Sequence, residues 1–160
     1  MQKVTVLCVG KLKEKFYAEA AAEYAKRLTR FCKLEILELP EERLPENPSP
    51  AQIAAALERE AVAVHAKPPP AAFVVALCVE GKLRSSEDLA RMMADSAGRG
   101  FSQVVFLIGG SFGLDASLKA QAAERLSMSP MTFPHHLARV MVLEQIYRAY
   151  QINAGTRYHK

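Results

Sequence analysis

Three stretches of the chain have residue types and spacings that suit chemistry, and the first is the glycine-rich run Gly109-Gly110-Ser111-Phe112-Gly113. Glycine lets the backbone approach a ligand closely, so this run fits either a phosphate cradle or a tight structural turn. It lacks the G-x-G-x-x-G spacing of a dinucleotide site and the lysine of a P-loop. It also follows the fourth predicted strand, whereas a dinucleotide fingerprint follows the first. A nucleotide-dependent oxidoreductase is therefore disfavoured.

The second stretch is the proline-stiffened segment Met128–His135. Pro130 and Pro134 favour an extended backbone, whose free amides and carbonyls suit the edge of an adenine; a rigid connector is the alternative. His135 and His136 are adjacent, and on an extended segment their side chains would point in opposite directions. No Cys or Asp lies at ligand spacing from them, so we expect no metal site.

The third stretch is the C-terminal end. Glu144 and Arg148 lie four residues apart in the order that favours an ion pair within a helix, and a substrate-binding role is the alternative. The tail Arg157–Lys160 offers a tyrosine ring that can stack on a nucleobase and cations that can meet phosphates. His159 can exchange a proton near neutral pH. A disordered basic terminus is the competing interpretation.

Alternating strands and helices must position these stretches. Caps at Ser49, Ser85 and Asp115 predict where three of the helices begin. The predicted strands are Val4–Val9, Leu34–Leu39, Ala72–Val79, Val104–Ile108 and Arg125–Ser127, and the predicted helices are Glu14–Phe31, 50–65, 86–98, 116–123 and Leu137–Ala154. This alternation predicts an α/β fold with a mostly parallel sheet flanked by helices, in a single domain over residues 1–160. Ligands of such sheets bind at the carboxyl ends of the strands.

The last predicted helix is apolar around much of its circumference. One sheet face cannot cover that much apolar surface, so we expect a second copy of the chain to cover the remainder. Leu143 and Ile146 are the positions expected to contact the partner chain.

Composition narrows the class of protein. Half of the 160 residues are hydrophobic and the formal net charge is +4, which is typical of a folded soluble domain. Lys and Arg outnumber Glu within residues 1–33, which favours either a phosphate-facing surface or an ordinary solvated helix face. We expect no membrane span and no leader peptide. Cys8, Cys32 and Cys78 are few and widely spaced, so they are expected to be buried thiols in a cytoplasmic protein.

The order and spacing of several motifs together resemble the SPOUT-class ribosomal RNA large subunit methyltransferase H family. The resemblance extends over the whole chain. The motifs that carry it are Leu77–Lys82, Leu107–Gly113, Met131–His135, Arg139-Val140, Glu144–Ala149 and Tyr158–Lys160.

The resemblance implies a C-terminal trefoil knot, a homodimer and S-adenosylmethionine as the methyl donor. The implied substrate is pseudouridine-1915 of 23S ribosomal RNA, methylated at N3 on the assembled ribosome. Carried over by position, the cofactor contacts are Leu77, Gly109, Met128, Ser129, Pro130, Met131, Thr132 and Phe133. Ser111-Phe112 replaces the pair that relatives often have between the glycines, which leaves the role of the backbone intact.

Methylation at N3 also requires the N3 proton to leave. His159 and Tyr158 are the candidate proton acceptors, and Arg139 and Arg148 are the candidate cationic stabilisers; the sequence does not choose among them. A non-catalytic ribosome- or RNA-binding protein with the same basic surface is the alternative from a different class.

Overall fold

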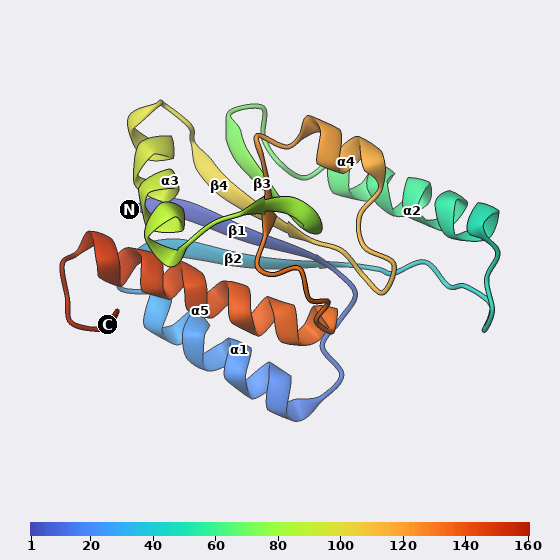
Figure 1. Cartoon of the computed structure of the whole chain (residues 1–160), viewed down its shortest axis with the longest axis horizontal. Helices are drawn as coiled ribbons and strands as arrows, with labels where there is room; N and C mark the ends of the chain where they lie inside the picture. Colours follow the sequence, from blue (N-terminus) through green and yellow to red (C-terminus); the bar gives the residue numbers. More distant parts are fainter.

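Five strands alternate with five helices in the computed structural model, which describes residues 1–160 (Figure 1). The strands are β1 (Gln2–Val9), β2 (Cys32–Leu39), β3 (Ala72–Leu83), β4 (Gln103–Ile108) and β5 (Glu124–Ser127). The helices are α1 (Lys15–Leu28), α2 (Pro50–His65), α3 (Ser86–Gly98), α4 (Ala116–Gln121) and α5 (His135–Asn153). The strands form one sheet in the order β2-β1-β4-β3-β5, and every neighbouring pair is parallel.

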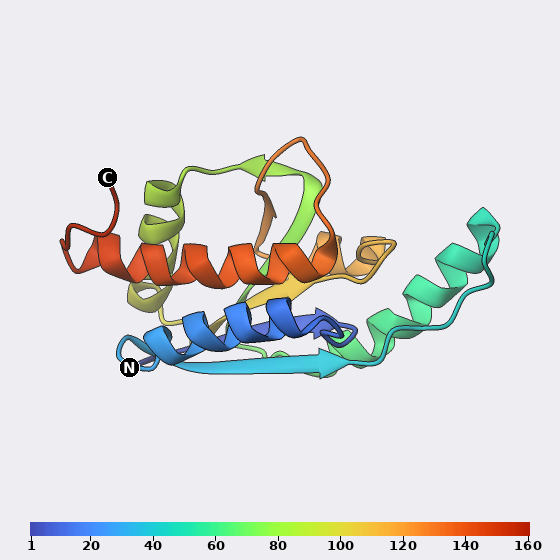
Figure 2. The same cartoon turned by 90° about the horizontal axis from the view of Figure 1, so that it is seen from below.

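The sheet is covered by helices on both faces, which explains why the apolar run Val104–Ile108 of β4 is buried on both sides. Alternate residues of one strand belong to different hydrophobic clusters, as Phe106 and Leu107 of β4 illustrate. Phe106 packs on the face covered by α1, α3 and α5, whereas Leu107 packs on the face covered by α2 and α4. Figure 2, viewed from the face that they cover, shows α1 and α5 side by side in front of the sheet. The predicted fold class is confirmed; the threading of a knot stays a prediction.

The predicted helix starts are confirmed by their caps. Ser49 and Ser85 each accept a hydrogen bond from the third residue of the following helix, and that residue bonds back to the cap in both cases. The side chain of Asp115 accepts from the Ser117 amide at 3.0 Å. None of the helices combines the length and the apolar character needed to cross a membrane.

Two expectations about the C-terminal helix are wrong. Leu143 and Ile146 are 0 % exposed because α5 is buried between α1 and α3 within one chain, so neither residue can contact a partner. His135 and His136 begin the helix instead of lying on an extended segment. Successive helical residues are about 100° apart, and the two imidazole rings accordingly lie together with centroids 4.1 Å apart.

The parallel arrangement gathers the carboxyl ends of all strands at one edge of the sheet. The glycine-rich run, the 128–134 segment and the end of β3 meet there. Strand β3 is four residues longer than predicted, because Lys82 and Leu83 pair again with β5 after a register shift. At the same edge, α2 and the segment 40–49 project away from the body of the molecule (Figure 2).

Candidate active site

A cavity of about 750 Å³ lies at the carboxyl ends of β3, β4 and β5. Three loops line it: the end of β3 from Leu77 to Glu80, the glycine loop 109–113, and the segment 128–135. Seven of the eight sequence-predicted cofactor residues line this cavity, and Pro130, which is exposed, does not. The volume is within the ordinary range for a small-molecule site, roughly 300–1,000 Å³.

The glycine loop is a tight turn that also forms a wall of the cavity, so the turn interpretation is confirmed and the phosphate cradle stays a prediction. The Gly113 amide donates to the Gly110 carbonyl at 3.1 Å, and Gly113 has a φ of +81°. A Cβ added at Gly109 would collide with the Gly113 backbone. Glycine is therefore required at both ends of the turn, whatever the loop binds.

Backbone groups dominate the segment 128–134. The Ser127 hydroxyl donates to the Ser129 carbonyl at 3.0 Å, and the Met131 amide donates to the Ser129 hydroxyl at 3.0 Å. These bonds fix the turn, while the amides of Thr132 and Phe133 donate to no other group of the chain. Two free amides on a fixed loop suit the acceptor nitrogens of an adenine.

The mouth of the cavity has both apolar and charged groups. Val79, Phe112 and Met131 are exposed hydrophobic side chains that line it. Lys119 Nζ lies 2.5 Å from Glu80 Oε1 in the wall of the cavity, and this hydrogen bond lowers the pKa of the Glu80 carboxyl. No group of three or more His, Cys, Asp or Glu side chains is arranged to hold a metal ion.

A second cavity, of about 460 Å³, adjoins the first through Leu126 and Met128, which line both. Its other walls come from the start of α3, at Ser85 and Ser86, and from Glu144 on α5. Glu144 therefore links this space to the C-terminal tail.

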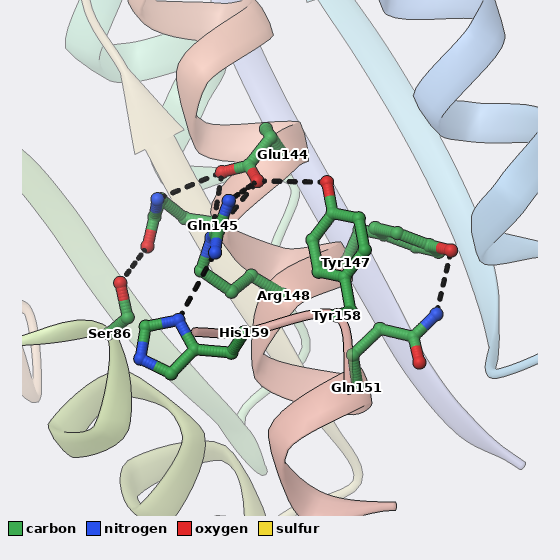
Figure 3. Close-up of polar contacts among 8 residues, drawn as sticks. All are labelled: Ser86, Glu144, Gln145, Tyr147, Arg148, Gln151, Tyr158 and His159. Atoms are coloured by element: carbon green, nitrogen blue, oxygen red, sulfur yellow. Dashed lines mark hydrogen bonds and ion pairs between the residues drawn. The ribbon is translucent and has the colours of Figure 1, made fainter. Parts of the chain in front are cut away.

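The tail folds back onto α5 and forms a polar cluster centred on Glu144 (Figure 3). Arg148 binds the Glu144 carboxylate at 2.6 Å, and the Tyr158 hydroxyl donates to it at 3.1 Å. His159 lies between two charged groups, with Nδ1 3.1 Å from Arg148 Nη1 and Nε2 2.7 Å from Glu87 Oε1. The helix-supporting Glu144–Arg148 pair is thus present, and it also holds the tail.

Donor and acceptor roles in this cluster follow from the partners. Arginine can only donate, so His159 Nδ1 accepts and Nε2 carries the hydrogen that faces Glu87. Burial, followed by the Glu144 carboxylate, raises the pKa of Tyr158, which therefore keeps its proton at neutral pH. Of the two residues, only His159 presents a ring nitrogen that accepts a hydrogen bond in this cluster, at Nδ1.

Arg139 does not join the other three residues proposed for catalysis. It is 3 % exposed, contacts Glu38 at 2.6 Å and donates to the Gly10 carbonyl at 3.0 Å. Partial burial alone would raise the pKa of Glu38, but hydrogen bonds from Arg139 and the Leu12 amide, with the charges of Arg139 and Lys11, together outweigh it and lower that pKa. These contacts tie α5 to the ends of β1 and β2, which favours a structural role for Arg139.

Comparisons with known proteins identify the family. A family model described as "Predicted SPOUT methyltransferase" matches residues 2–159. A relative from Bifidobacterium adolescentis, named "Ribosomal RNA large subunit methyltransferase H", is 50 % identical over 161 residues and covers 99 % of both chains. A relative of the same name from Clostridium novyi is 47 % identical over 98 % of this chain and 99 % of its own. The chain belongs to the SPOUT methyltransferase family.

Solved structures agree with this SPOUT methyltransferase assignment at the level of the fold. A putative methylase family protein from Neisseria gonorrhoeae superposes with a TM-score of 0.57, covering 99 % of this chain and 87 % of that one at 15 % identity. A probable methyltransferase from Bordetella pertussis gives a TM-score of 0.55 over 93 % and 96 % of the two chains at 14 % identity. The resemblance stated from the sequence motifs is confirmed.

The sequence analysis did not predict two acidic residues that contact the tail and the glycine loop of this SPOUT methyltransferase. Glu87 contacts His159 from the first turn of α3, and Glu41 contacts the glycine loop from the segment after β2. Each contact joins residues about 70 positions apart, so no local spacing could have indicated it.

Proposed function

We propose that this protein methylates N3 of a pseudouridine in 23S ribosomal RNA, position 1915 in the family's substrate, on the assembled ribosome. S-adenosylmethionine is the proposed methyl donor. The observation that carries the proposal is the 750 Å³ cavity lined by seven residues at the cofactor positions of the family. The full-length relatives that bear the name ribosomal RNA large subunit methyltransferase H support the choice of substrate.

The cavity fits the proposed cofactor in the chemistry of its walls. The free amides of Thr132 and Phe133 suit an adenine edge, and the glycine loop lets the backbone approach the rest of the molecule closely. Apolar side chains such as Leu77 and Met128 exclude water from the same space. Bound S-adenosylmethionine would supply an activated methyl group, so the chain's own task is orientation and the removal of a proton.

His159 is the proposed proton acceptor and Arg148 the cation beside it. Within one chain both nitrogens of His159 are engaged, by Arg148 and by Glu87. Nδ1 is the accepting nitrogen and is occupied by Arg148, so accepting a proton from a substrate requires His159 to release Arg148. Tyr158 is proposed to position the tail through Glu144, and Arg139 to support α5.

A homodimer is part of the proposal. Residues Val140, Met141 and Tyr147 of α5 remain only partly buried within one chain, so a partner can cover this side of the helix. The tail leaves the C-terminal end of α5, far from the chain's own cofactor cavity at the other end (Figure 1). We propose that each tail serves the cofactor cavity of the partner chain.

Methyl transfer to ribosomes tests the proposal directly. Tritiated S-adenosylmethionine is incubated with the protein and with ribosomes that lack the modification, and the labelled nucleoside is identified by mass spectrometry. The expected product is a pseudouridine methylated at N3 in 23S RNA. Label on another nucleoside would contradict the assigned substrate, and cofactor binding without transfer to any RNA would contradict the assigned activity.

A further inference from the structure

We propose that Glu41 is a positioning residue that holds the glycine loop in the shape that binds the methyl donor. The inference rests on the proposed function for the identity of that ligand. Its geometry stands on contacts between the glycine loop and the segment 40–49.

The Glu41 carboxylate occupies a notch formed by two glycines. A Cβ added at Gly110 would lie 2.5 Å from Glu41 Oε1, and one added at Gly10 would lie 3.3 Å from Glu41 Oε2. Any side chain at Gly110 would therefore displace the carboxylate. Gly10 follows β1 and Gly110 follows β4, so two strand ends that are far apart in the sequence both leave room for the Glu41 carboxylate.

In this notch the carboxylate accepts a hydrogen bond from the backbone of the glycine loop. The Ser111 amide donates to Glu41 Oε1 at 2.8 Å. Ser111 is exposed at the tip of the turn, and the turn's own hydrogen bond joins Gly113 to Gly110 without involving Ser111. Glu41 thus supplies the only hydrogen bond to the tip from outside the loop, and its acceptor is charged.

Glu41 contacts a residue that lines the cavity but does not line the cavity itself. Gly110 and Ser111 line the 750 Å³ cavity, whereas Glu41 does not. His135, which does line the cavity, has a buried Nε2 with no hydrogen-bond partner, and that atom lies 3.9 Å from the Cβ position of Gly10. The carboxylate therefore holds the loop from outside the cavity, so its role is positioning rather than catalysis.

The test compares Glu41→Ala and Glu41→Gln with a matched control, Glu46→Ala, which removes an exposed carboxylate from the same segment. Calorimetry measures S-adenosylmethionine affinity, and hydrogen exchange by mass spectrometry follows the peptide containing residues 109–113 without cofactor. Glu41→Ala is expected to weaken binding about tenfold, the usual size for losing a bond to a charged group, and to speed exchange of the loop. Glu41→Gln keeps an acceptor oxygen at the same reach, so it should recover most of both losses, and Glu46→Ala should match the wild type.

Separate measurements of KM and kcat distinguish a positioning role of Glu41 from a general loss of folded structure. With ribosomes as substrate, Glu41→Ala should raise KM for S-adenosylmethionine while kcat at saturating cofactor and Tm stay near wild type. Wild-type affinity together with wild-type exchange in Glu41→Ala would overturn the inference, and so would a loss in Glu41→Gln as large as that in Glu41→Ala. A wild-type protein that binds no S-adenosylmethionine would overturn the proposed function instead, and the cofactor-free exchange experiment would still decide whether Glu41 anchors the loop.

Discussion

Gly109 shows how one residue can serve the fold and the site together. A Cβ there meets the Gly113 backbone, so Gly109→Val must push the loop into the cavity or open the turn. We expect Gly109→Val to weaken S-adenosylmethionine binding at least about a hundredfold and to destabilise the fold by roughly 1–3 kcal/mol, as overpacking does. Calorimetry and thermal unfolding measure the two effects. Gly98→Ala, which adds its Cβ into open space, is the control, and unchanged affinity in Gly109→Val would remove the loop from the site.

His135 couples stability to pH. Burial, followed by the charges of His136 and Arg139, lowers its pKa in the folded protein. The unfolded chain therefore binds a proton more readily, so this residue destabilises the fold as pH falls below the unfolded value, about 6.5. We expect Tm to drop between about pH 7.5 and 5.5, and to drop less in His135→Gln. His65→Gln, at an exposed position, should keep the wild-type pH dependence; an equal drop in all three proteins would show that His135 titrates normally.

At the scale of elements, the C-terminal tail is ordered by its contacts with two helices. Tyr158 binds Glu144 on α5 and His159 binds Glu87 on α3, although neither residue lines the 750 Å³ cavity. Deleting Tyr158–Lys160 should therefore leave S-adenosylmethionine affinity within about tenfold of wild type. Ribosome methylation should fall at least about a hundredfold, the size typical of losing positioned acid–base groups.

Single substitutions in the tail show which of its residues the methylation rate depends on. His159→Ala should lose part of the methylation rate, whereas Lys160→Ala, at an exposed terminal position without a hydrogen-bond partner, should retain it. Tritium transfer to unmodified ribosomes measures the rates, alongside calorimetry for the cofactor. A truncated protein that methylates at the wild-type rate would show that the tail has no role in the reaction, and the proton acceptor would then be another group.

At the scale of the whole molecule, the half-buried side of α5 is the expected dimer contact. Met141 lies on this side, so Met141→Glu should place an unpaired charge at the interface and cost several kcal/mol of dimer stability. We expect this variant to sediment as a monomer at micromolar concentration and to lose methylation. Val62→Glu alters an equally apolar but exposed residue on α2, and it should remain dimeric. A monomeric wild-type protein, or full activity in monomeric Met141→Glu, would contradict the proposal.

Leu143→Glu is the contrasting variant. Leu143 is fully buried in the core of one chain, so a charge there should prevent folding instead of dissociating folded monomers. Circular dichroism separates these outcomes, because a dissociated chain keeps its helical signal and an unfolded chain loses it.

Features that depend on neighbouring residues could be predicted from the sequence. Apolar runs gave the strands, the caps Ser49, Ser85 and Asp115 marked helix starts, and the glycine and proline spacing marked the two loops that line the cavity. These features are local because hydrogen bonding within a turn and the periodicity of side chains act over a few residues. The alternation of elements then left a parallel sheet as the simplest arrangement.

Contacts between distant groups became known only from the folded arrangement. Periodicity showed that α5 is apolar on most sides, but it could not show that α1 and α3 of the same chain bury Leu143 and Ile146. It likewise could not separate Arg139, which binds Glu38, from Arg148, which binds the tail. Glu41 and Glu87 resemble ordinary surface carboxylates in the sequence. Their partners are fixed by the packing of strand ends and helices far apart in the chain, and a pattern read along one chain contains no such distances.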